Sequence, residues 1–176
     1  NTPVPSTSSW LTVYFTDPPY GVQEKDREID FCGVYSLAPN GKVQGWDKKL
    51  PRPNGIALSP DEKTLYVSDS QTGAVYSYPR SKDGSVGAQR MFAQLERVGP
   101  GVPDGLRVDA LGRVFATGPG GVHVLDPSGK PITVLRTPET AANVAFGGDD
   151  GRTLFITSQT SVVSVRTKVP GNDWKR

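Results

Sequence analysis

Short runs of alternating apolar and polar residues recur along the chain, and turn residues separate them. The segment "RPNGIALSPDEKTLYVSDS" at 52–70 shows the unit: an Asn-Gly pair, an alternating run, a second turn and a second alternating run. Alternation with a period of two predicts β-strands, and Asn-Gly is typical of a tight turn. The pattern therefore predicts about 14 short antiparallel strands and almost no helix.

One order of elements repeats four times in the chain. A strand that ends near a small hydroxyl residue, followed by a loop and another strand, occurs as "YFTD" with "GVYSL", "YVSD" with "AVYSY", "FATG" with "GVHVL", and "FITS" with "SVVSV". Three copies are preceded by a turn residue and a short strand, which begin at Asn54, Asp104 and Asn143. Repeats of about 40–50 residues built from about four short strands predict the blades of a β-propeller.

The predicted fold class is all-β, an incomplete propeller of about four blades in a single domain over 1–176. Its first 11 residues are expected to be irregular, because "PVPSTSSW" is rich in Pro and Ser where the innermost strand of the first blade belongs. N-terminal blades are therefore expected to be missing, and the fourth copy lacks an outermost strand. The expected blades are approximately 12–50, 51–98, 99–138 and 139–171.

Composition and charge exclude several classes of partner. Lys and Arg number 20 against 18 Asp and Glu, and the basic residues are scattered, which argues against a nucleic-acid surface. Cys32 is the single cysteine, so neither an internal disulfide nor a zinc cluster can form. No apolar run approaches the roughly 20 residues that cross a membrane. A soluble protein is expected; its compartment stays open, with the cytoplasm favoured.

The candidate metal ligands occupy equivalent positions in three successive blades. Innermost strands line the channel of a propeller, so the side chains of Asn54, Asp104 and Asn143 are expected to converge at one mouth. Amide and carboxylate oxygens suit a hard cation such as Ca²⁺. The alternative is a turn role alone, because Asn-Gly and Asp-Gly are common turn dipeptides.

Four other residues carry reactive or polar groups. His123 takes the position that Tyr and Val fill in the other copies, which indicates packing in the third strand. Cys32 has no partner at a nucleophile motif spacing. Asp17 and Tyr20 lie in "TDPPYG", a stiff loop that either shapes a substrate pocket at the channel mouth or is a plain rigid turn.

Five segments together resemble the SMP-30/gluconolactonase/LRE-like family, also called regucalcin-like. They are "YFTDPPYG", "GVYSLAPNGKV", "RPNGIALSPDEKTLYVSDS", "PDGLRVDALGRVFATGPGGVHVLDPSGK" and "ANVAFGGDDGRTLFITSQTSV". The resemblance spans about residues 12–171 and corresponds to the C-terminal two-thirds of the family pattern. It implies a propeller of the six-bladed gluconolactonase type, in which a central divalent cation supports the hydrolysis of a sugar lactone.

The resemblance also assigns roles to residues. It implies that Asn54 is a metal ligand and that Asp104 is both a metal ligand and the catalytic base. Asp17, Tyr20 and Asn143 are the expected substrate contacts. Ca²⁺ is the expected cofactor, with Zn²⁺, Mg²⁺ or Mn²⁺ as alternatives. The family's N-terminal glutamate ligand and the asparagine of the preceding blade have no counterpart here, so weak cation binding is expected.

Three functions remain open from the sequence. The first is a metal-dependent lactone hydrolase whose partner is a small sugar lactone, with neither nucleic acid nor membrane involved. The second is a non-catalytic binding or scaffold protein, a partial propeller that self-associates through its open blade edges. The third is an organophosphate-type esterase that uses the same site.

Overall fold

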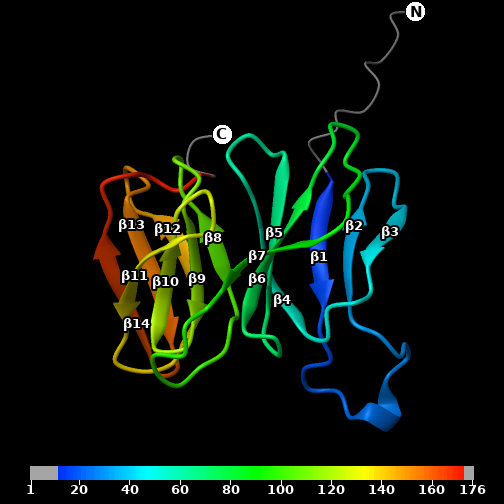
Figure 1. The fold of residues 1–176 in the computed structure, drawn as a ribbon, viewed down its shortest axis with the longest axis horizontal. Coiled ribbons are helices and arrows are strands. Elements are labelled where there is room, and N and C mark those ends of the chain that lie inside the picture. Colours follow the sequence, from blue (N-terminus) through cyan, green and yellow to red (C-terminus); the bar gives the residue numbers. More distant parts are fainter. Residues whose placement is uncertain (1–11, 173–176) are drawn as a thin grey trace, which may run out of the picture.

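The computed structural model describes residues 12–172, which form β-strands and one short 3-10 turn at Glu24–Asp26. These residues contain 14 strands in four antiparallel sheets, of three, four, four and three strands in chain order (Figure 1). The expectation of an all-β chain with about 14 strands is confirmed. The expected irregular segment 1–11 lies outside the described residues.

Each sheet is a meander of consecutive strands, as expected for a propeller blade. The first two sheets contain β1 (Val13–Asp17), β2 (Gly33–Leu37) and β3 (Val43–Asp47), then β4 (Pro53–Leu58), β5 (Thr64–Asp69), β6 (Ala74–Pro79) and β7 (Arg90–Gln94). The last two contain β8 (Leu106–Val108), β9 (Val114–Gly118), β10 (Gly121–Leu125) and β11 (Pro131–Arg136), then β12 (Ala141–Gly147), β13 (Thr153–Ser158) and β14 (Ser161–Arg166).

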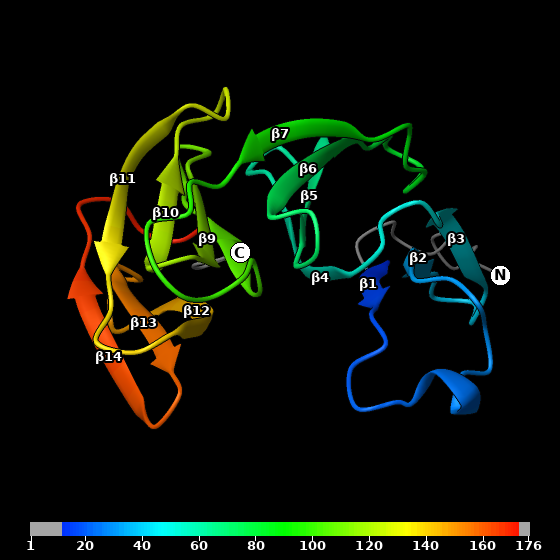
Figure 2. The same cartoon turned by 60° about the horizontal axis from the view of Figure 1, so that its bottom comes forward.

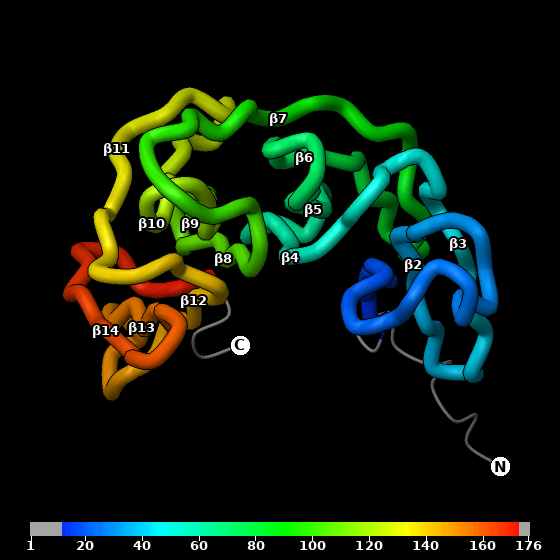
Figure 3. Tube along the Cα trace, turned by 90° about the horizontal axis from the view of Figure 1, so that it is seen from below, coloured from blue at the N-terminus to red at the C-terminus, as the bar shows by residue number. Residues whose placement is uncertain are grey.

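The four sheets follow one another around an arc that does not close (Figures 2 and 3). Strands β4, β8 and β12 lie on the inner side of this arc, and β7 and β11 lie on the outer side. The first sheet begins with β1, which is the counterpart of β5, β9 and β13 in the repeat. The described residues therefore form a partial propeller whose innermost strands present one shared concave surface.

Alternation along the second strand of a blade decides which neighbour each side chain meets. In β5, Leu65 and Val67 pack in the cluster with the first sheet, whereas Tyr66 packs in the cluster with the third sheet. Successive side chains of a strand point to opposite faces, so one strand serves two interfaces between blades. Each of the three interfaces holds its own cluster of buried apolar side chains.

The predicted tight turn at Asn54-Gly55 is wrong. Both residues lie inside β4, and the pairing with β5 shifts register between Pro53 and Ile56, which is a β-bulge. Neither Asn54 nor Gly55 has a positive φ angle, and the same holds for Asp104 and its following glycine. A bulge re-aims a side chain without reversing the chain, so the turn-only interpretation fails for Asn54.

No helix of the part described here is long and apolar enough to span a membrane.

Candidate functional site

Asn54 and Asp104 lie side by side on neighbouring blades. Asn54 lies near the start of β4, and Asp104 comes two residues before β8. The backbone amide of Gly55 donates to the carbonyl oxygen of Asp104 at 3.0 Å, which ties the two blades together at this level. The side-chain amide of Asn54 lies beside the carboxylate of Asp104, and this interaction partly offsets the rise that burial causes in the pKa of the carboxyl. The expectation that these side chains share one end of the blades therefore holds in the structure.

Asn143 lies next along the same row, on the fourth sheet. The backbone amide of Gly105 donates to the carbonyl of Ala142 at 2.9 Å, which repeats the link between blades. The Oδ1 atom of Asn143 accepts from the backbone amide of Val144 at 2.8 Å and lies against Gly105. Asn143 is exposed and borders the site. Its side-chain oxygen already accepts the hydrogen bond from the neighbouring Val144 amide.

The glycines after Asn54 and Asp104 permit this close approach of the blades. A Cβ atom on Gly55 would overlap the carbonyl oxygen of Asp104, and one on Gly105 would overlap the side chain of Asn143. Glycine is needed here because another backbone or side chain approaches closely. The Asn-Gly and Asp-Gly pairs are thus explained by packing between blades.

Burial sets the electrostatics of Asp104. Desolvation raises the pKa of this carboxyl above its ordinary value of 3.8, and the hydrogen bond from Asn54 partly offsets the rise. A half-buried carboxylate whose pKa is raised is disfavoured in its charged form, and a nearby cation would relieve that cost.

The raised pKa predicts that Asp104→Asn stabilises the metal-free protein. An acid whose pKa is higher in the folded state costs no stability below its unfolded pKa, and the cost grows as pH rises through its folded pKa. We therefore expect Asp104→Asn to raise the melting temperature at pH 7, by an amount that shrinks toward pH 3.5. Thermal unfolding of both proteins in a chelator, followed by circular dichroism, measures this difference. A lower melting temperature for the variant at pH 7 would contradict it.

The donor set around Asp104 fits a hard cation. Carboxylate and amide oxygens are the ligand types that Ca²⁺ takes, and Asp104 and Asn54 carry one group of each kind. Within residues 12–172 no three His, Cys, Asp or Glu side chains gather into a group that could hold a metal. A site built on Asn54 and Asp104 would therefore depend on amide, backbone or water oxygens for its remaining ligands.

Tyr20 reaches this site, whereas Asp17 belongs to a different hollow. The amide nitrogen of Asn54 lies 3.5 Å from the Tyr20 hydroxyl, and the guanidinium of Arg52 lies over the Tyr20 ring at 5.6 Å. Tyr20 remains 49% exposed, so its hydroxyl is accessible at the mouth of the site. Asp17 lines a pocket of about 330 Å³ in the loop between β1 and β2, and neither Asn54 nor Asp104 lines that pocket.

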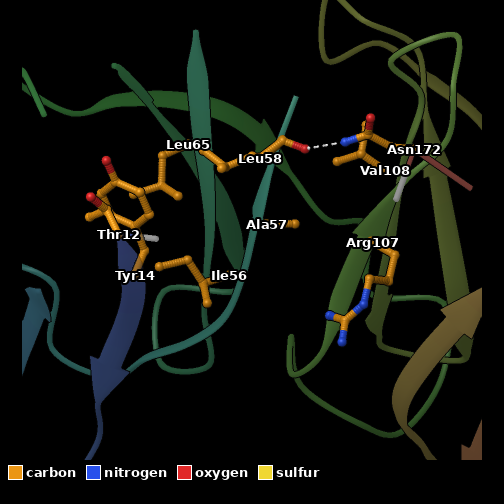
Figure 4. A pocket seen from close by; sticks show the side chains of 9 residues that line it. All are labelled: Thr12, Tyr14, Ile56, Ala57, Leu58, Leu65, Arg107, Val108 and Asn172. Carbon is orange, nitrogen blue, oxygen red and sulfur yellow. Dashed lines mark hydrogen bonds between the residues drawn. The ribbon is translucent and has the colours of Figure 1, made fainter. Parts of the chain in front are cut away.

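A second pocket lies at the opposite ends of the inner strands (Figure 4). Its volume is about 370 Å³, and it is lined by Thr12, Tyr14, Ile56, Ala57, Leu58, Leu65, Arg107, Val108 and Asn172. The predicted site residues do not line it, because Asn54 and Asp104 precede the parts of β4 and β8 that do.

His123 and Cys32 are both buried, and the hydrogen bond of each goes to a residue other than Asp104. The burial of His123 in β10 agrees with the packing role that its position in the repeat indicated. His123 is 3% exposed, and its Nε2 atom lies 3.0 Å from the carbonyl of Pro119. Burial lowers the pKa of this imidazole. Cys32 is 7% exposed, and burial raises the pKa of its thiol, which disfavours the nucleophilic thiolate.

Sequence reasoning missed the three residues that hold Asn54 and Asp104 in place. They form the segment Ser68, Asp69 and Ser70 at the end of β5. The fully buried carboxylate of Asp69 accepts a hydrogen bond from the backbone amide of Arg52 at 2.7 Å, which fixes the approach to Asn54. The sequence does contain a signal for these residues, because a hydroxyl residue recurs near the end of the second strand of each blade. Its role becomes visible only from the hydrogen bonds between blades.

The four consecutive antiparallel sheets in an open arc define a partial β-propeller. A family model described as "SMP-30/Gluconolactonase/LRE-like region" matches residues 9–160. The chain belongs to this family.

Relatives with known names are similar over most of this chain. The gluconolactonase of Zymomonas mobilis subsp. mobilis is 36% identical over 172 residues, which cover 90% of this chain and 48% of the relative. Lactonohydrolase oryH of Aspergillus oryzae is 32% identical over 198 residues, which cover 93% and 42%. The structure of XC5397, a gluconolactonase from Xanthomonas campestris, matches with a TM-score of 0.77 and 33% identity over 91% of this chain and 53% of that chain. The chain spans about half the length of these proteins.

Proposed function

We propose that this protein takes part in hydrolysis of a sugar lactone with the help of a divalent cation, Ca²⁺ in the first instance, held by Asn54 and Asp104. The observation that carries the proposal is that Asn54 and Asp104 lie side by side on consecutive blades, where the backbone amide of Gly55 donates to the Asp104 carbonyl at 3.0 Å. The names of the relatives, gluconolactonase and lactonohydrolase, support the substrate class.

The chemistry assigned to this site is the addition of water to a cyclic ester. A bound divalent cation would polarise the lactone carbonyl. Asp104 would accept a proton from the attacking water as the general base. The water oxygen bonds to the carbonyl carbon, the ring C–O bond breaks, and the ring oxygen takes the proton from Asp104 and leaves as a hydroxyl group. The carboxylic acid that forms then loses its proton to solvent. The products are a carboxylate and an alcohol on one open chain.

Asn54 and Tyr20 would orient the reacting groups. The Asn54 amide lies beside the Asp104 carboxylate and is itself held by its hydrogen bond to Ser70 at 3.2 Å. The exposed hydroxyl of Tyr20 and the guanidinium of Arg52 stand at the mouth, where they would donate to hydroxyl groups of the sugar. Asn143 would border the substrate from the next blade. Asp17, the last residue of β1, lines the neighbouring pocket, so its role as a substrate contact stays a prediction.

Removing the metal should abolish most of the activity. We expect a chelator to lower the rate of gluconolactone hydrolysis by at least about 10-fold, because the carbonyl loses its Lewis acid. A pH-stat assay measures acid release before chelation, after chelation and after Ca²⁺ is restored. Added Zn²⁺, Mg²⁺ or Mn²⁺ identifies the preferred metal. A rate that chelation leaves unchanged would refute metal dependence. A phosphotriester substrate in the same assay tests the organophosphate-type esterase.

One observation favours a second candidate, a scaffold that associates through its open face. Val13, Leu37 and Val43 are paired neighbours across β1, β2 and β3 and are 56%, 37% and 55% exposed. A row of exposed apolar side chains on a sheet face promotes association. Sedimentation velocity on the purified chain and on Val43→Lys separates the candidates. A dimer that Val43→Lys dissociates, with no lactonase activity in either state, would favour the scaffold.

A further inference from the structure

We propose that Ser68 and Ser70 are positioning residues that set the spacing between Asn54 and Asp104. This inference rests on the proposed function, because it concerns the same site. Both serines lie on the face of the second sheet that meets the third sheet, on the same side as Tyr66. They are well placed to connect a residue of one blade with a residue of the next.

The hydroxyl of Ser68 bridges the two blades. Its Oγ atom accepts a hydrogen bond from the backbone amide of Gly55 at 2.8 Å and donates to the carbonyl of Asp104 at 2.5 Å. The serine is fully buried, so water does not compete for these bonds. One hydroxyl group therefore fixes the peptide that follows Asn54 relative to the peptide that follows Asp104.

The hydroxyl of Ser70 makes a second bridge, to a side chain. It donates to the carbonyl of Pro103 at 2.6 Å and accepts from the Nδ2 atom of Asn54 at 3.2 Å. Pro103 immediately precedes Asp104. Ser70 thus orients the amide of Asn54 toward the carboxylate that this amide contacts.

The repeat shows that the first bridge is a general device of this chain. Thr16, at the position of Ser68 in the first blade, donates to the carbonyl of Asn54 at 2.6 Å. Thr117, at the same position in the third blade, lies within 3.2 Å of the carbonyl of Ala142 on the fourth. Between the second and third blades, the bridging hydroxyl is that of Ser68, and it bonds the peptides that follow Asn54 and Asp104, the two residues assigned to the cation.

The spacing has a functional consequence because ligand geometry determines metal affinity. Partners that orient metal ligands typically contribute about 10–100-fold to affinity or activity. Without the Ser68 hydroxyl, the Gly55 amide retains its bond to the Asp104 carbonyl at 3.0 Å, so the blades remain in contact. Loss of the Ser68 hydrogen bonds should therefore make the spacing between Asn54 and Asp104 less well defined, without unfolding the protein.

The test compares Ser68→Ala and Ser70→Ala with a rescue variant and a matched control. Ser68→Thr keeps the hydroxyl and matches the threonines at the equivalent positions of the repeat. Ser158→Ala removes a fully buried serine that donates to the carbonyl of Glu139 at 2.9 Å, away from Asn54 and Asp104. For each variant the full chain is titrated with Ca²⁺ by calorimetry. The hydrogen-exchange rate of the Gly55 amide is measured by NMR in the metal-free state.

We expect Ser68→Ala to weaken Ca²⁺ binding about 10-fold and to accelerate exchange of the Gly55 amide. Ser70→Ala should weaken Ca²⁺ binding and leave Gly55 exchange unchanged. Ser68→Thr should restore both properties, and Ser158→Ala should change neither. Ca²⁺ affinity that falls equally in Ser158→Ala, or stays unchanged in both Ser68→Ala and Ser70→Ala, would overturn the proposal.

Failure of the proposed function gives a different result. If the protein without substitutions binds no Ca²⁺, the cation site is refuted. The exchange rate of the Gly55 amide still tests whether the Ser68 hydroxyl bridges the two blades. Unchanged Gly55 exchange in Ser68→Ala would then overturn the spacing role as well.

Discussion

Asp104→Ala is expected to reduce gluconolactone hydrolysis by at least about 100-fold. The change removes the group assigned as the base and, with it, the carboxylate that would hold the cation. Initial rates at saturating Ca²⁺, measured by acid release, give the loss directly.

The control for this variant is Asp126→Ala. Asp126 lies in the turn between β10 and β11, and its Oδ1 atom accepts from Ser128 and Lys130. This change removes one negative charge from the same blade without touching the site, so it should keep nearly full activity. Loss of activity in both variants would point to a charge or folding effect. Activity in Asp104→Ala equal to that of the unchanged protein would exclude the assigned base.

Gly55→Ala is expected to destabilise the protein by about 1–3 kcal/mol and to weaken the cation site at the same time. The added Cβ would overlap the carbonyl oxygen of Asp104 and would lie 2.9 Å from the backbone nitrogen of Leu106. Backbone cannot swing aside as a flexible side chain does, so the second and third blades must separate locally. That separation moves Asn54 away from Asp104. Urea unfolding and Ca²⁺ titration measure the two effects.

Gly45→Ala is the matched control for this substitution. Gly45 also lies in a strand and lacks a positive φ angle, but an added Cβ would meet its nearest neighbour, on the Tyr35 ring, at 3.4 Å. That is ordinary contact, so the free energy of unfolding should change by less than about 1 kcal/mol. An equal loss of stability in the two variants would show that the close approach of the blades is not the cause.

The strands could be predicted from the sequence because their signals are local. Alternation and turn residues lie within each run, and the fourfold repeat fixes their order. The neighbourhood of Asn54 and Asp104 followed from the same repeat, since equivalent positions of successive blades lie side by side. The roles of both residues as metal ligands remain predictions.

The Asn54-Gly55 pair could not be interpreted correctly from local sequence, because it lies in a β-bulge and forms no turn. The reason for Gly55 is the carbonyl of Asp104, which belongs to the next blade. The same limit applies to Ser68 and Ser70, whose partners also lie across the interface. Asp17 and Tyr20 are close in sequence, yet Asp17 ends β1 whereas Tyr20 lies in the loop that follows, and of the two only Tyr20 lies within 3.5 Å of the Asn54 amide.

The central claim is that Asn54 and Asp104 together hold one divalent cation. Calorimetric titration of Ca²⁺ into the unchanged chain, Asn54→Ala, Asp104→Ala and the double variant tests it most directly. The account predicts one site in the unchanged chain, weaker binding in each single variant, and a double variant that loses less than the two single losses combined, because residues that share a ligand are coupled. Equal Ca²⁺ affinity in all four proteins, or no binding by the unchanged chain, would contradict the account.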